Sequence, residues 1–393
     1  MIKHSKVWLD NLLFHNHFKA NNAAGCLTDE EYEKLKVKYP IGFYHPGIFV
    51  RIGLFILTCI IIAFSTGLLS LMLADARLID NFGWPLVLGV GCYVILELMM
   101  KKKHYYQSGI DNALLWSSAI SLTMAFAWML DTLGNYKGDH YIGLSLFVLL
   151  LSIYLTLRFT DLLMSVVTCI SYLASIFFLW NSIGAFGLTT MPFTMMLASG
   201  SLYFVSVKLY AQPKATYYQT CLAIAQIVSL MAIYLSGNYF VVQRLSAELN
   251  GAAPGTPITF GLIFWIWTII IPLIYIIWGV KKKDKVLLRT GMLLVASAIF
   301  TFRNYYHVLP VEVALTLGGC ILLALSYLLI KYLKTPKHGF TYAEPNGKSL
   351  MDRINIESLI IGETFSHTSN APTQSNSTFG GGSSGGGGSS ANY

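Results

Sequence analysis

Long apolar runs separated by short basic connections dominate this sequence, and they restrict the chain to a membrane-spanning fold. About ten segments of roughly 18 to 25 residues are almost free of charge, and each can cross a bilayer core of about 30 Å as an α-helix. We place these spans at residues 48–74, 83–100, 111–131, 140–157, 160–181, 186–207, 215–237, 258–279, 286–302 and 309–330. The expected fold is all-α, a polytopic bundle of about ten transmembrane helices.

The lysine and arginine residues of the connections predict the orientation. If the N-terminus is cytosolic, 23 of the 27 basic residues fall on the cytosolic side. The outside loops then keep only Arg77, Lys137, Arg244 and Arg303. Because basic residues are retained on the cytosolic side of a membrane, this distribution supports an even number of spans. Both termini are therefore expected in the cytosol.

The composition excludes several classes of protein. With 55% hydrophobic and 12% charged residues, the chain differs from a soluble globular domain. The net charge of +8 comes from the connections beside span ends, where anionic lipid headgroups account for it, so we expect no nucleic-acid binding. The first 40 residues are polar and lack the pattern of a cleavable signal peptide, so the first span should serve as an uncleaved anchor.

Three regions follow from the pattern. Residues 1–47 form a cytosolic amphipathic helical segment, in which Thr28 and Glu31 have the spacing of a capping box. A unit this small buries little surface, so it should pack on the membrane domain or on a partner. Residues 48–333 form the transmembrane domain. Residues 334–393 form a cytosolic tail whose Gly/Ser-rich end is predicted to be flexible.

Catalytic and metal-binding motifs are scarce in this sequence. Outside the low-complexity Gly/Ser-rich end, the chain has no His-Glu-x-x-His, no Gly-x-Ser-x-Gly and no phosphate-binding glycine loop, so we expect no enzymatic activity and no cofactor. Five of the six cysteines lie in predicted spans, without paired spacing. A disulfide framework, a zinc site or any other metal site is therefore not expected.

Glu97 is the clearest ionisable residue inside a predicted span. Such residues are costly in a membrane and often functional, so Glu97 is a candidate for an intramembrane polar site. Lys101 follows four residues later, which is the favourable spacing for a pair on one helix. We favour an ion pair at the cytosolic rim over a proton relay. In the next inside turn, Arg158 and Asp161 should pair with each other or cap helix ends.

Polar side chains also gather at the outside turn between the last two predicted spans. They are Arg303, Asn304, His307 and Glu312, and Asp131, Asp139 and His140 are predicted on the same side. Arg303 and Glu312 together could clamp a zwitterionic or anionic solute. The simpler interpretation is a salt bridge at the rim beside a solvated His307.

Three segments carry a resemblance to a protein family. They are DEEYEKLKVKYP at 29–40, RNYYHVLPVEVALTLGGCILLALSYLLIKYL at 303–333, and SLIIGETF at 358–365 with the Gly/Ser-rich end. Together they resemble an uncharacterised group of bacterial multi-span membrane proteins that is classed only by a domain of unknown function. The Gly/Ser-rich end is also similar to the tails of envelope-associated TPM-domain proteins. The resemblance implies the bacterial cytoplasmic membrane and no particular activity.

The sequence is compatible with two functions. The first is a non-enzymatic, envelope-associated integral membrane protein that contacts the lipid bilayer and binds protein partners through its cytosolic N-terminus and C-terminal tail. The alternative is a secondary transporter of a small solute. The ten-span plan favours the transporter, and Pro192 and Pro272 could form part of a transport pathway. Ordinary helix kinks are the simpler interpretation of these prolines, and the sequence has no mid-span carboxylate for ion coupling.

Overall fold

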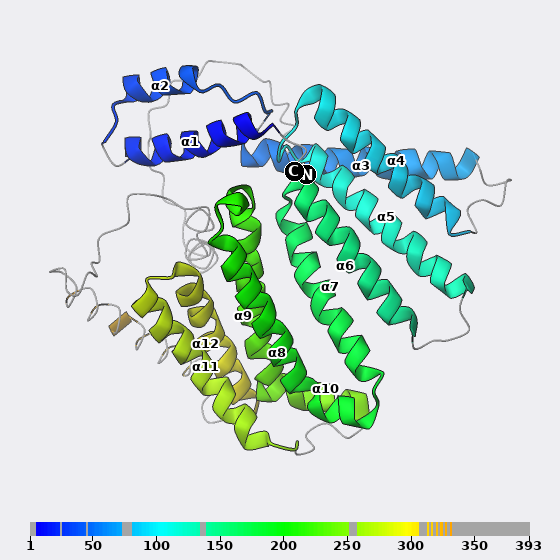
Figure 1. Ribbon diagram of the computed structural model, residues 1–393, viewed down its shortest axis with the longest axis vertical. Helices are drawn as coiled ribbons and strands as arrows, with labels where there is room; N and C mark the ends of the chain where they lie inside the picture. The colour runs from blue at the N-terminus through cyan, green and yellow to red at the C-terminus, as the bar shows by residue number, and fades with distance from the viewer. Residues whose placement is uncertain are drawn as a thin grey trace, which may run out of the picture.

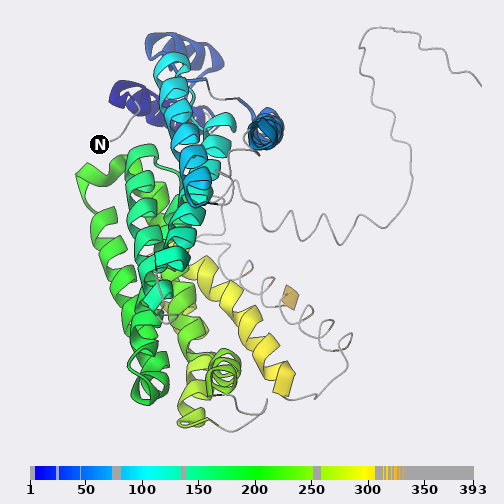
Figure 2. The same ribbon diagram turned by 90° about the vertical axis from the view of Figure 1, so that its right-hand side faces the viewer.

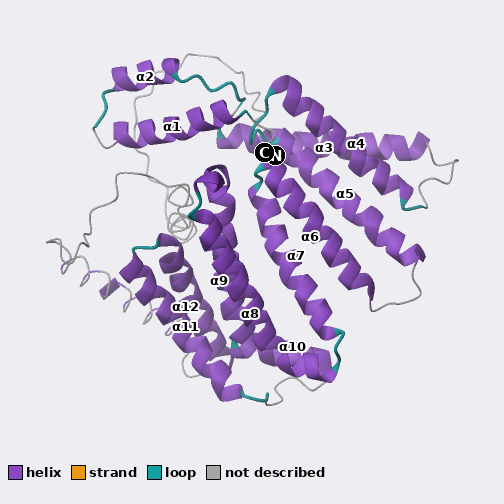
Figure 3. Ribbon diagram, viewed as in Figure 1, coloured by secondary structure: helices purple, strands orange, loops and turns teal. Residues whose placement is uncertain are grey.

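The computed structural model describes residues 5–23, 26–44, 46–72, 81–133, 139–250 and 258–305, together with seven single positions between 313 and 331. These residues form helices and no β-strand, with one isolated β-bridge between Tyr44 and Tyr105 (Figure 3). The predicted all-α fold is thus confirmed. In this part of the chain nine helices are long and apolar enough to cross a membrane. The tenth predicted span, 309–330, lies outside the described residues apart from single positions.

The long helices match the predicted spans closely. They are α3 (Ile48–Met72), α4 (Gly83–Lys103), α5 (Ile110–Leu133), α6 (Asp139–Phe159), α7 (Leu162–Asn181), α8 (Ala185–Tyr210), α9 (Gln219–Gly237), α11 (Gly261–Lys282) and α12 (Lys285–Tyr305). A 3-10 turn, η2 (Pro213–Tyr218), precedes α9. Three shorter helices complete the order, namely α1 (Lys6–Ala23), α2 (Asp29–Lys38) and α10 (Tyr239–Asn250).

Consecutive long helices pair as antiparallel hairpins. The closest pairs are α4 with α5, α6 with α7, α8 with α9, and α11 with α12, and the hairpins open like a fan (Figure 1). Because successive long helices alternate in direction, the basic residues of the connections lie at one end of the fan, beside α1. We call this end the basic end. Its members include Lys101, Lys102, Lys103, Arg158, Lys208, Lys281 and Lys282.

Helix α3 differs from the other long helices in its burial and direction. No residue in its most apolar window is buried, and it runs across the basic end at a large angle to α8 and α9 (Figure 1). Figure 2 shows α3 almost end-on. Its start lies against the loop before α5, where Gly109 has a φ of 96° and a Cβ would fall 2.2 Å from the Arg51 carbonyl oxygen. Only glycine allows this approach.

Two apolar cores hold the fan together. The first joins the four helices α4, α5, α6 and α7 and includes Leu96, Leu114, Leu155 and Met164. The second joins α9, α11 and α12 through residues that include Leu230, Tyr234, Tyr275 and Leu294. Pro192 and Pro272 lie inside α8 and α11, and both helices continue through them. These prolines therefore do not break the spans.

The N-terminal segment has the helix start that its sequence predicts. Thr28 Oγ1 accepts a hydrogen bond from the Glu31 amide at 3.3 Å, and the Glu31 carboxylate accepts one from the Thr28 amide at 2.9 Å, so the capping box is confirmed. The Glu31 pKa is lowered because the Thr28 backbone and hydroxyl donate to the ionised carboxylate. The cap fixes where α2 begins.

Candidate functional site

Glu97 belongs to a polar cluster near the basic end. Its Oε1 lies 2.5 Å from Nε of Arg158 on α6, and it accepts a hydrogen bond from the Tyr93 hydroxyl at 3.0 Å. The hydroxyls of Tyr93 and Tyr154 lie 2.6 Å apart. The Glu97 side chain is 18% exposed and that of Arg158 is 29% exposed. This cluster ties α4 to α6 through charge-assisted bonds.

The ion pair expected at Glu97 is present, but with a different partner. Lys101 is exposed, and the pair forms across two helices with Arg158. The i to i+4 rule considers only neighbours on one helix, whereas the end of α6 brings a guanidinium to the same depth as Glu97. A proton-relay role of Glu97, beyond the ion pair, stays a prediction.

Asp161 is the centre of a second cluster, in the short turn between α6 and α7. Its Oδ1 accepts from the Met164 amide at 2.9 Å, which confirms the predicted helix cap. Its Oδ2 accepts from Nδ2 of Asn112 at 2.7 Å, and Asn112 Oδ1 accepts from Nη2 of Arg51 at 3.3 Å. These bonds join the starts of α3, α5 and α7.

The Asp161 carboxyl is buried, with 8% of the residue exposed. Burial raises its pKa, while the hydrogen bonds from Met164 and Asn112 act in the opposite direction. The sequence signal for the cap was an Asp before an apolar run. No spacing rule connects Asp161 to Asn112, so sequence reasoning missed this cluster.

The structure describes only some of the polar residues that were predicted at the outer side. Arg303 is half-buried near the end of α12, while His307 and Glu312 lie outside the described residues. The solute clamp therefore remains a prediction. His140 Nδ1 lies 3.5 Å from Asp131 Oδ1, and this contact links α6 to α5. The ends of α5 and α12 lie on opposite sides of the fan, so Arg303 lies away from the contact between His140 and Asp131 (Figure 1).

A third polar cluster, also missed from sequence, holds α9 to α12 at the end opposite to the basic end. Asn238 is 1% exposed, and its Nδ2 donates to the Tyr234 hydroxyl and to Oγ1 of Thr301, both at 2.9 Å. Thr268 on α11 accepts from the Tyr239 amide at 3.0 Å. Buried polar groups need such partners, so this arrangement stabilises helix packing.

No group of three or more metal-ligating side chains occurs among the described residues. The six cysteines are free thiols, and Cys92, Cys169 and Cys221 are buried. Comparisons of the chain with protein-family models, with curated proteins and with solved structures found no match.

Proposed function

We propose that this polytopic membrane protein is a non-enzymatic assembly protein of the bacterial cytoplasmic membrane, and that it presents α2 to protein partners at the cytosolic surface. One observation carries the proposal. Helix α2 is capped and well formed, and none of its ten residues is buried. A short helix that buries nothing by itself, but is held in a fixed place, fits a binding role.

Contacts of α1 support the fixed position. The Trp8 ring on α1 packs edge-on against His104 with a centroid distance of 4.8 Å, and Phe43, in the connection after α2, stacks on Tyr106 at 5.0 Å. The Tyr217 hydroxyl donates to Asp10 Oδ1 at 2.9 Å, which joins α1 to η2. These contacts attach α1 to the basic end at two separate places.

Helix α2 is in turn held on α1 from one side. His15 Nε2 donates to the Tyr39 carbonyl at 2.7 Å, and Asn11 Nδ2 donates to the Pro40 carbonyl at 2.9 Å. The opposite side is open, and Val37 is 81% exposed there. A preformed helix lowers the conformational cost of binding, so α2 is suited to receive a partner.

Polar groups within the spans or next to their ends also favour an assembly role. Glu97 is bonded to Arg158, and Asn238 is bonded to Thr301. Both contacts connect helices, as expected when polar side chains stabilise a bundle. The secondary transporter remains the competing function, although the continuity of α8 and α11 removes the broken helices that Pro192 and Pro272 had suggested.

A site-specific photo-crosslinker tests the proposal in living cells. We expect a crosslinker in place of Val37, in the full chain, to capture a discrete protein. The matched control replaces Tyr210, which is also exposed and lies at the basic end but on α8, and it should not capture that protein. Equal capture at both positions, or no capture at Val37, contradicts the proposal. Removal of residues 340–393 then measures how much the tail contributes to the same complex.

Reconstitution separates the two candidate functions. The purified protein in sealed proteoliposomes should take up no solute above empty vesicles when it acts only in assembly. Uptake that is lost in Arg303→Ala would favour the transporter and the outer clamp. Uptake that survives Arg303→Ala would favour transport by another route. Either uptake result contradicts the assembly proposal.

A further inference from the structure

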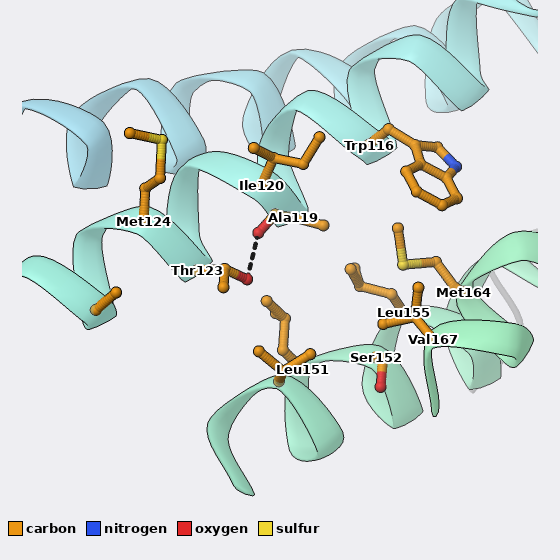
Figure 4. Close-up of a pocket in the computed structure, with 12 residues that line it drawn as sticks. Trp116, Ala119, Ile120, Thr123, Met124, Leu151, Ser152, Leu155, Met164 and Val167 are labelled. Carbon is orange, nitrogen blue, oxygen red and sulfur yellow. Dashed lines mark hydrogen bonds between the residues drawn. The ribbon is translucent and has the colours of Figure 1, made fainter. Parts of the chain in front are cut away.

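A cavity of about 270 Å³ lies between α5, α6 and α7, and we call it the α5–α7 cavity (Figure 4). Its walls are mostly aliphatic and methionine side chains, including Met124, Leu151, Leu155, Met164 and Val167. It is independent of the surface used in the proposed function. A cavity of only about 150 Å³ with such walls stays dry and binds benzene, so this one can hold a larger apolar group.

The two hydroxyls on the cavity wall are already used within their own helices. Thr123 Oγ1 donates to the Ala119 carbonyl at 2.8 Å, and Ser152 Oγ donates to the Leu149 carbonyl at 3.1 Å. Neither hydroxyl therefore needs a water molecule or a polar ligand. The cavity presents an apolar surface to its occupant.

The mouth of the cavity faces the side of the helix layer. Ile120 and Met124 are one turn apart on α5, and they are 55% and 57% exposed. On a spanning helix, exposed apolar side chains contact lipid chains. A lipid chain can thus enter sideways without crossing water.

The cavity lies toward the basic end of the helices that form it. On α6 and α7 its lining residues lie between Val148 and Val167, and none is more than eleven residues from the helix end at the basic end, which is Phe159 for α6 and Leu162 for α7. Eleven helical residues span about 16 Å, and half of a bilayer core is about 15 Å. On α5 Trp116 is the lining residue nearest the basic end, because α5 starts there at Ile110. The cavity therefore lies mainly in the leaflet at the basic end.

Trp116 adds a polar group at this end of the cavity. Its indole Nε1 is buried and has no hydrogen-bond partner among the described residues. In Figure 4 the ring lies beside Met164, at the far end from Met124. A buried donor without an acceptor is costly, which indicates that an acceptor is missing at this level. Indole rings typically lie where lipid chains meet headgroups, and ester carbonyls are acceptors there.

We propose that the α5–α7 cavity binds one acyl chain of a phospholipid from the leaflet at the basic end, with the Trp116 N–H bonded to an ester carbonyl of that lipid. The apolar walls hold the chain, and the indole sets its depth. The bound lipid then acts as part of the packing between α5 and the α6–α7 hairpin.

Native mass spectrometry of the full chain, purified in mild detergent with one synthetic phosphatidylglycerol, tests this proposal. The wild-type protein should retain one phospholipid through collisional activation that strips the others. Trp116→Phe keeps an aromatic ring but removes the N–H donor, and Ala127→Phe fills the far end of the cavity. Each variant should retain at least about fivefold less lipid, equivalent to about 1 kcal/mol.

The experiment includes a matched control substitution and a second substitution that fills the cavity. Trp278→Phe removes an exposed indole on α11 that also lies toward the basic end, and it should retain lipid as the wild type does. If Ala127→Phe does not fold, as judged by circular dichroism and gel filtration, Thr123→Leu fills the middle of the cavity instead. Equal retention in wild type and both cavity variants overturns the proposal. Retention of added palmitate in place of the phospholipid overturns it as well.

Discussion

Glu97 and Asp161 both carry a carboxylate close to the basic end, and each is held by side chains from another helix. The sequence predicted an ionisable candidate at Glu97 and a cap at Asp161, since both depend on local composition. It did not predict Arg158 or Asn112 as partners, because these are 61 and 49 residues away. At the residue scale, the sequence therefore predicts which residues are ionisable candidates or caps, but not which distant residues they contact.

Arg158→Met should lower the free energy of unfolding by about 2 kcal/mol, because it leaves the Glu97 carboxylate without its charged donor. Adding Glu97→Gln should restore part of the loss, since the uncompensated charge is then gone. Lys101→Met is the matched control and should change little, because Lys101 is exposed. Denaturant unfolding in detergent measures the wild type and all three variants. A loss for Lys101→Met as large as that for Arg158→Met contradicts the cross-helix pair.

Asp161 should make stability depend on pH. Its pKa in the folded state lies above the ordinary 3.8, so the folded state binds this proton more tightly than the unfolded state does. The resulting stabilisation is complete below the unfolded pKa and is lost as the pH rises through the folded pKa.

Asp161→Asn keeps an oxygen for the Met164 amide but removes the titration. The difference in melting temperature, wild type minus variant, should therefore fall as the pH rises from about 4, and then become constant. Scanning fluorimetry between about pH 4 and pH 7 measures it. A difference that stays constant throughout this interval contradicts the assignment.

At the scale of single helices, hydropathy predicted the position of each described span to within a few residues. Helix α3 starts at Ile48, as expected, whereas α4 continues to Lys103, past the predicted end at residue 100. Lysines are good helix formers, so a helix continues into water after its apolar run has ended. The 3-10 turn η2 also replaces the α-helix predicted for the first residues of the seventh span. Hydropathy therefore predicts which residues contact the membrane, whereas local hydrogen bonding determines where each helix ends.

Two glycines should respond in opposite ways to alanine. Gly109→Ala places a Cβ against the Arg51 carbonyl and forces alanine into a positive φ, so it should cost at least about 2 kcal/mol and loosen α3 from α5. Gly200 lies inside α8, and apart from the local backbone of α8 no atom would come within 4 Å of a Cβ there. Gly200→Ala should therefore stabilise the protein by up to about 1 kcal/mol. Denaturant unfolding in detergent measures both. Equal effects of the two substitutions would show that the close approach at Gly109 does not matter.

At the scale of the whole molecule, charge and hydropathy predicted an alternating series of helices, and the described helices form such a series. The fan and the transverse position of α3 were not predictable in this way. They depend on contacts between distant residues, such as Gly109 with Arg51 and Asn112 with Asp161. Spanning helices usually tilt by no more than about 40°. Helix α3 makes a large angle with α8 (Figure 1). Whether α3 crosses the membrane is therefore the question about the topology that most needs an experiment.

Cysteine labelling with a membrane-impermeant reagent tests this topology. Cys26 is exposed and should react only after the membrane is opened, because the N-terminal segment is predicted to be cytosolic. With Cys26 and Cys320 replaced by serine, Met72→Cys and Asn250→Cys should each react in intact cells, since an odd number of described spans precedes each of them. Protection of both in intact cells would show that α3 does not cross the membrane. A C-terminal tag that is accessible in intact cells would exclude the tenth span, because one further crossing after α12 is needed to return the chain to the cytosol.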